Sequence, residues 1–188
     1  DVPTLVNRRC LWHEGPRQVW RMAIARREGA LPSISVHAGD NEELTAVVSR
    51  VQTLIIEESV RPQDILLLCP TNERARQYGV ALRRAAILGV DSVHVTDTER
   101  DARLCRPGHL TISTVHSSKG LDAYFVLIAS ANEFPTTVEG RASFYVGCTR
   151  AIEYLEVFAT RSDNLVPEIR DSFSYFEQHP QPDQAPDT

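Results

Sequence analysis

The sequence lacks several features that would assign a protein to a class directly. No apolar run approaches the roughly 18 residues that a membrane-spanning helix needs. Residues 1–10 also lack the basic-then-apolar order of a secretory signal. We therefore expect a soluble, cytoplasmic protein. The chain begins with Asp1 rather than methionine, so we expect it to be a piece of a longer polypeptide.

Cysteine is scarce, and its spacing excludes the usual cross-linked classes. The four cysteines are widely separated, without a Cys-x-x-Cys pair or a histidine at ligand spacing: Cys10, Cys69, Cys105 and Cys148. This pattern favours free thiols in a reducing compartment over disulfides or a zinc site. No metal-binding residue is predicted.

Positive charge is also limited, and lysine is almost absent. The net charge of −5 argues against a protein that coats nucleic acid, so any DNA contact must be local. Lysine and arginine together number 20, and Lys119 is the single lysine, which leaves 19 arginines. A lone lysine in the stretch His116–Gly120 indicates a site that needs a compact ammonium group, with chance as the alternative.

Short apolar segments alternate with amphipathic ones along most of the chain. Continuous apolar runs such as 64–69 are typical of strands buried on both faces of a sheet. We predict strands at 34–38, 64–69, 92–95, 109–115, 124–129 and 155–159, and helices at 17–28, 40–58, after residue 72, and at 139–152. The pattern predicts a three-layer, doubly wound, mostly parallel α/β domain over residues 1–177. We expect Asp40 and Asn41 to cap the second helix. The Pro-rich residues 178–188 are expected to form a flexible tail.

Two polar segments are candidates for chemistry. The segment 114–122 follows a predicted strand, and we expect it at the carboxyl edge of the sheet, where ligands bind in such folds. A capped, solvated turn is the alternative. The segment 145–151 is expected on the last helix, with Arg150 near its carboxyl end. There Arg150 has a purely structural alternative, which is to cap the helix or to pair with Glu153.

Together these segments resemble the fifth and sixth motifs of UvrD/Rep-type superfamily-one DNA helicases. The first matches through Thr114, His116, Lys119, Gly120 and Leu121, with Asp122 in place of glutamate. The second matches through Tyr145, Val146, Gly147, Thr149, Arg150 and Ala151. The resemblance implies the second RecA-like motor domain of such an enzyme. It implies the compact form, because few residues separate Asn72 from Thr114, where larger relatives carry an inserted subdomain.

The resemblance also implies which residues bind DNA. Thr114 and His116 would contact the backbone of single-stranded DNA, with Lys119 in the same loop. Thr71 and Asn72 match a further strand-turn-helix segment of the family, and would approach DNA or only cap their helix.

For the nucleotide, the resemblance implies a different set. Arg150 would reach the γ-phosphate of ATP bound by the other motor domain, an effect worth about 10³–10⁵ in rate in related phosphoryl transfer. Gly120 and Asp122 would lie at the nucleotide, with Asp122 accepting a hydrogen bond from the ribose. Arg9, in a weaker match over residues 5–10, would be a second phosphate-sensing arginine.

The phosphate-binding half of such an enzyme is missing from the sequence. No Gly-x-x-x-x-Gly-Lys-[Ser/Thr] occurs, and Lys119 cannot supply its lysine because Gly120 follows it. We therefore expect ATP with Mg²⁺ to be held mainly by an N-terminal RecA-like motor domain, and this chain alone to be inactive as an ATPase. The leading hypothesis is an ATP-dependent DNA helicase or translocase of the nucleoid, acting in DNA repair.

Two other classes stay open. The first is a RecA-like adaptor that binds protein or nucleic acid without catalysis. The second is an unrelated small-molecule α/β enzyme that uses Cys69 or Cys148 as its nucleophile, although apolar surroundings would raise the pKa of either thiol.

Overall fold

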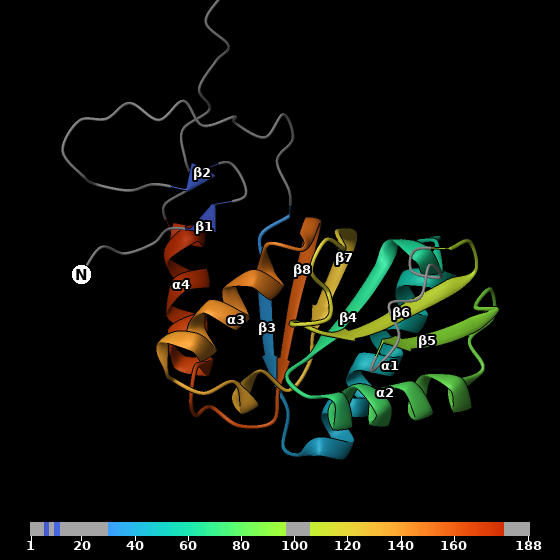
Figure 1. Ribbon diagram of the computed structural model, residues 1–188, viewed down its shortest axis with the longest axis horizontal. Coiled ribbons are helices and arrows are strands. Elements are labelled where there is room, and N and C mark those ends of the chain that lie inside the picture. The colour runs from blue at the N-terminus through green and yellow to red at the C-terminus, as the bar shows by residue number, and fades with distance from the viewer. Residues whose placement is uncertain (1–5, 8–9, 12–29, 97–105, 179–188) are drawn as a thin grey trace, which may run out of the picture.

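A six-stranded parallel sheet forms the centre of the molecule (Figure 1). The computed structural model describes residues 6–7, 10–11, 30–96 and 106–178. The strands of the sheet are β3 (Ser33–Val36), β4 (Ile65–Cys69), β5 (Ser92–Thr96), β6 (His109–Thr114), β7 (Ala123–Ile128) and β8 (Ala151–Ala159). Their spatial order is β3-β8-β7-β4-β6-β5, and every neighbouring pair is parallel. The predicted parallel α/β sheet is confirmed.

Helices cover both faces of this sheet. They are α1 (Asp40–Ile56), α2 (Asn72–Ala85), α3 (Val138–Cys148) and α4 (Val166–Gln178), with short 3-10 turns η1 (Pro62–Asp64) and η2 (Ala131–Glu133). Figure 1 shows α3 and α4 beside β3 and β8, whereas α2 lies next to β5 and β6. Among the described residues, no helix is both long and apolar enough to cross a membrane. A separate antiparallel pair is formed by β1 (Val6–Asn7) and β2 (Cys10–Leu11).

The central strand β4 shows why three layers form. All five of its residues are buried, and successive side chains point to opposite faces. Leu67 packs with α1 and α2 in one apolar cluster, whereas Leu66 and Leu68 pack with α3 and α4 in the other. A continuous apolar strand therefore supplies both cores at once, as its sequence predicted.

Two predicted details of the helices are wrong. Gly39, rather than Asp40 or Asn41, occupies the N-cap of α1, and no side chain caps it. The Asp40 carboxylate instead pairs with Arg74, and Glu42 accepts a hydrogen bond from the Ala38 amide at 3.0 Å. The last predicted helix also ends early, because α3 stops at Cys148 and β8 begins at Ala151.

Some predictions fall partly or wholly outside the described residues. The predicted helix at 17–28, Arg9 and residues 179–188 lie there, so the single domain over 1–177 and its tail stay predictions. The helix α4 was not predicted.

Candidate functional site

The predicted site residues divide between the two edges of the sheet. The segment 114–122 starts at the carboxyl end of β6 and finishes at the amino end of β7. Our prediction that the whole segment lies at the carboxyl edge is therefore wrong for Asp122. Arg150 precedes β8, which makes it a second residue of the amino edge.

At the amino edge, Asp122 and Arg150 form an ion pair. The Arg150 Nη1 lies 3.0 Å from the Asp122 Oδ1, and their side chains are 21% and 58% exposed, respectively. The Arg150 Nε also donates to the Val146 carbonyl oxygen in the last turn of α3, at 3.3 Å. The capping alternative therefore holds for Arg150, but its carboxylate partner is Asp122 rather than Glu153.

The strands behind these two residues explain how they meet. The Ala123 amide donates to the Arg150 carbonyl oxygen at 3.0 Å, and Ala123 pairs with Ala151 where β7 and β8 begin. The turn between α3 and β8 is closed by the Thr149 amide, which donates to the Tyr145 carbonyl oxygen at 3.0 Å. Two segments far apart in sequence are therefore held together by the sheet itself.

At the carboxyl edge, the predicted DNA-binding residues follow neighbouring strands. Cys69 at the end of β4 is in register with Thr114 at the end of β6. Thr71 and Asn72 follow the first of these strands and His116 the second, so all lie at one edge. Thr71 caps α2, because its Oγ1 accepts a hydrogen bond from the Arg74 amide at 3.2 Å.

The side chains in this group differ in their access to a ligand. Asn72, His116 and Lys119 are exposed. Thr114 is only 7% exposed, and its Oγ1 accepts from the Ser117 amide at 3.2 Å and donates to the Ser117 Oγ at 3.1 Å. Thr114 therefore stabilises the turn of this loop through Ser117, and Ser117 rather than Thr114 is exposed to solvent.

Gly120 and Ser118 fix the rest of this loop. Gly120 has a φ of +84°, a conformation that favours glycine, and open space surrounds the position of a Cβ there. Ser118 is fully buried, and its Oγ donates to the Val115 carbonyl oxygen at 2.8 Å. Sequence reasoning missed Ser118, although a serine beside the motif's lysine was visible as a turn-forming residue.

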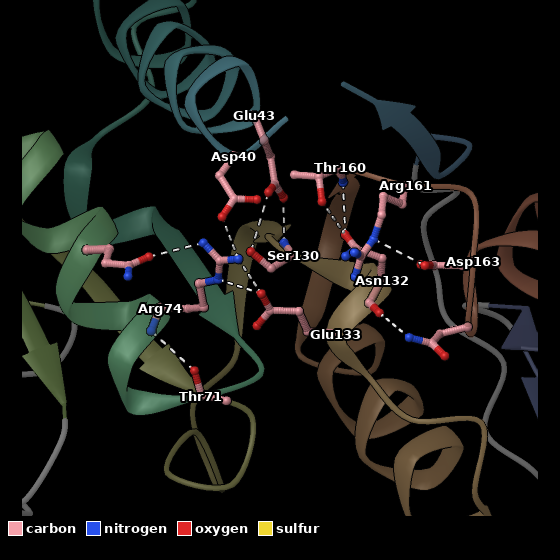
Figure 2. A network of polar contacts seen from close by, with 12 residues as sticks. Asp40, Glu43, Thr71, Arg74, Ser130, Asn132, Glu133, Thr160, Arg161 and Asp163 are labelled. Atoms are coloured by element: carbon pink, nitrogen blue, oxygen red, sulfur yellow. Dashed lines mark hydrogen bonds and ion pairs between the residues drawn. The ribbon is translucent and has the colours of Figure 1, made fainter. Parts of the chain in front are cut away.

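A polar network that the sequence did not predict lies further along the carboxyl edge (Figure 2). It lines a pocket of about 270 Å³ whose walls come from the start of α1, from α2 and η2, and from the segments that follow β3 and β8: Ala38, Gly39, Asp40, Arg74, Asn132, Glu133, Thr160 and Arg161. Figure 2 shows Arg74 between two carboxylates. Its Nη2 lies 2.8 Å from the Asp40 Oδ2, and its Nε donates to the Glu133 Oε1 at 2.6 Å.

Two buried polar groups complete this network. Asn132 is 2% exposed, and its Oδ1 accepts from the Thr160 amide at 2.9 Å, which joins the ends of β7 and β8. Glu43 of α1 is fully buried, and its Oε1 accepts from the Ser130 amide at 2.5 Å. Burial raises the pKa of Glu43, although the bond from Ser130 opposes the shift. The polar stretch 130–133 after β7 was the available sequence signal.

The charged side chains of Arg74 and Arg161 in this network are paired with carboxylates. The hydrogen bond to Glu133 is the main cause of the raised pKa of Arg74, which stays cationic. The Arg74 amide also donates a hydrogen bond to the Thr71 Oγ1. The network therefore connects to the turn that carries Thr71 and Asn72. Among the described residues, no group of three or more His, Cys, Asp or Glu side chains is arranged to hold a metal ion.

The cysteine hypothesis finds no support at either edge. Cys69 is fully buried in the core, and burial is the main cause of the raised pKa of its thiol. Such a thiol is unreactive at neutral pH. Cys148 is half-buried at the end of α3.

The strand order and the helices on both faces define a RecA-like α/β domain. The C-terminal domain of a possible DNA helicase from Lactobacillus plantarum WCFS1 is similar in structure, with a TM-score of 0.56 and 21% identity over 70% of this chain and 75% of that one. The HK97 bacteriophage large terminase gives a TM-score of 0.54 and 12% identity, over 80% of this chain and 34% of that one. At such identities the likeness shows the fold.

The sequence of part of the same region matches a family model. Residues 90–162 match the family described as the UvrD-like helicase C-terminal domain. This range runs from β5 to β8 and includes both Asp122 and Arg150, but not Arg9, Thr71 or Asn72. No curated protein matches the chain by sequence. Residues 90–162 are therefore similar to a UvrD-like helicase C-terminal domain, which agrees with the structural likeness to the helicase domain from Lactobacillus plantarum.

Proposed function

We propose that this chain is the second motor domain of an ATP-dependent DNA helicase or translocase, and that Arg150 is its arginine finger. The observation that carries the proposal is the meeting of both motif segments at the amino edge, where the Arg150 guanidinium lies 3.0 Å from Asp122 and stays partly exposed. A planar guanidinium is suited to a transferring phosphoryl group because its fixed fork matches the oxygens. The nucleotide would lie between this edge and another motor domain.

The residues present indicate which part of the ATP site this chain contributes. The sequence has no phosphate-binding loop, so the phosphates and Mg²⁺ of ATP are held mainly by the N-terminal motor domain. Mg²⁺ held by that domain would neutralise charge on the phosphates. This chain contributes Arg150, which stabilises negative charge on the γ-phosphate as it transfers. In isolation the chain is inactive as an ATPase.

The carboxyl edge is the proposed contact with single-stranded DNA. His116 and Asn72 are exposed there on neighbouring loops, and the exposed Lys119 adds a positive charge further along the loop of His116. The overall charge of −5 makes a broad electrostatic surface unsuitable, so these contacts act locally. Nucleotide and DNA therefore approach opposite edges of one sheet. Closure of the two domains around ATP changes how tightly this domain binds the single-stranded DNA.

The first experiment replaces Arg150 with Ala in the complete gene product. We expect ATP turnover to fall by about 10³-fold or more, with little change in ATP affinity, because an arginine finger acts on the transition state. The matched control is Arg61→Ala, which removes a more exposed arginine that is also paired with an aspartate, at 2.6 Å, before β4. Unchanged turnover in the Arg150 variant would rule out the arginine finger and favour the adaptor.

A second experiment tests the DNA edge. His116→Ala should lower the stimulation of ATPase activity by single-stranded DNA and leave the DNA-independent rate near that of the parent. His109→Ala is the control, because it removes a histidine from the opposite end of β6. Equal loss of both rates in the His116 variant would indicate damage to the fold instead of a DNA contact.

A further inference from the structure

Asp122 has a partner within the chain that the family resemblance does not imply. The resemblance assigns this acidic position to the ribose of the nucleotide. In the structure, the Asp122 Oδ1 accepts a hydrogen bond from the Arg150 Nη1 at 3.0 Å. The side chain is one methylene shorter than the glutamate of the motif, which keeps its carboxylate close to its own loop.

The guanidinium of Arg150 is held from two directions. The Val146 carbonyl oxygen accepts from Nε at 3.3 Å, and Asp122 accepts from Nη1. One contact comes from α3 and the other from the loop before β7, so the two together fix the plane of the group. Within the described part of the chain, no side chain or carbonyl binds the Arg150 Nη2.

The backbones of the two residues are also tied together. The amide of Ala123, directly after Asp122, donates to the carbonyl oxygen of Arg150 at 3.0 Å. The pairing of β7 with β8 therefore brings Asp122 and Arg150 side by side.

We propose that Asp122 is a positioning residue, which holds the Arg150 guanidinium with Nη2 available for a phosphate, and not the ribose ligand of this motor. This inference rests on the proposed role of Arg150. Arginine has five N–H donors, so a guanidinium can bind Asp122 and Val146 and still donate to phosphate oxygens. Orienting the group in advance lowers the reorganisation required in the transition state.

The two roles of Asp122 predict different kinetics in the complete gene product. If Asp122 positions Arg150, Asp122→Asn lowers kcat by about 10-fold to 10²-fold with KM for ATP nearly unchanged, because a misplaced group weakens only the transition state. If Asp122 binds the ribose, the same change raises KM. It also reduces the preference for ATP over 2′-deoxy-ATP or 3′-deoxy-ATP, since the neutral amide oxygen accepts a weaker hydrogen bond from the ribose hydroxyl than the carboxylate does.

A double mutant shows whether Asp122 acts through Arg150. When Asp122→Asn is added to Arg150→Ala, we expect no further loss of kcat, because the group that Asp122 orients is already gone. Asp122→Glu should recover part of the rate, since it restores the negative charge. Asp64→Asn is the control, because it removes a carboxylate paired with Arg61 at 2.6 Å beside the same edge. Circular dichroism and melting curves exclude variants that fail to fold.

The outcomes separate this inference from the proposed function. A fall in kcat that disappears in the Arg150→Ala background, with the deoxy-ATP preference retained, supports the positioning role. A rise in KM with a reduction of that preference, or kinetics like the parent, overturns it while the arginine finger stands. Additive losses in the double mutant also overturn it. Normal turnover of Arg150→Ala removes the proposed function itself.

Discussion

Replacing Glu43 should change how the stability of the domain depends on pH. Glu43 is fully buried, and its carboxylate accepts from the Ser130 amide at 2.5 Å and from the Ser130 Oγ at 3.4 Å. Burial raises the pKa of this carboxyl above its ordinary value of 4.5. The folded protein therefore keeps the proton to a higher pH than the unfolded chain does.

The sign of the effect follows from this difference. A raised pKa in the folded state gives a stabilisation that is complete below pH 4.5 and is lost as pH rises through the folded-state pKa. Between these two values the free energy of unfolding should fall by about 1.4 kcal/mol per pH unit because of this group. Glu43→Gln should remove that fall, since the amide does not titrate and its oxygen can still accept from the Ser130 amide.

Glu43→Ala should be destabilising at every pH. It leaves the buried Ser130 amide without its acceptor, which costs about 1–3 kcal/mol, and it opens a cavity under the start of α1. We expect a total loss of about 2–4 kcal/mol, or about 4–16 °C in Tm for a domain of this size.

The assay is urea unfolding of the chain from pH 4.5 to pH 8. The control is Glu57→Gln, the same chemical change at the exposed carboxyl end of α1. We expect the Glu43→Gln curve to flatten relative to the parent and the Glu57→Gln curve to follow it. Parallel curves for parent and Glu43→Gln would refute the reasoning, because they would mean that Glu43 has the same pKa in both states.

Three further outcomes test the fold. Ala86 ends α2 in the left-handed region at φ 46° and is exposed, so Ala86→Gly should raise the free energy of unfolding by about 0.5–1 kcal/mol in urea; a lower value would contradict the strain. Gly140→Ala should lower the free energy of unfolding by about 1–3 kcal/mol, because its Cβ would overlap the Pro135 carbonyl oxygen. A Tm equal to that of the parent would contradict this, because it would mean that the backbone shifts without cost. Cys69 should resist a thiol reagent until the chain unfolds, while Cys148 reacts earlier, as mass spectrometry after timed labelling can show; fast native labelling of Cys69 would contradict its burial.

The sequence predicted the sheet well because its strands are buried on both faces. A segment such as 65–69 has no polar face, so its apolar run is visible without knowledge of its neighbours. The start of β8 was missed for the opposite reason. Its first residues, Ala151 and Ile152, continue the helical pattern of α3, and only the pairing of Ala151 with Ala123 makes them a strand.

The sequence motifs single out the residues of the candidate site, but not how those residues are arranged. The motifs singled out Asp122 and Arg150, yet their contact depends on β7 and β8 being neighbours, which no local pattern encodes. Glu43 was missed because a charged residue in a helix is normally solvated. Its burial results from packing against Ser130, a residue far away in sequence.

The sheet joins the two proposed contact regions into one unit. β8 runs directly from Arg150 at the amino edge to Thr160 at the carboxyl edge, where Asn132 fixes its end through the Thr160 amide at 2.9 Å. Glu133, next to Asn132, accepts a hydrogen bond from the Arg74 side chain. The Arg74 amide in turn donates to the Thr71 Oγ1. Strands paired along their length resist relative sliding, because a shift would break every hydrogen bond of the ladder together. If ATP draws Arg150 toward another domain, as proposed, we therefore expect the proposed DNA-binding edge to move with it as a rigid body, and the conformational change to take place between the domains.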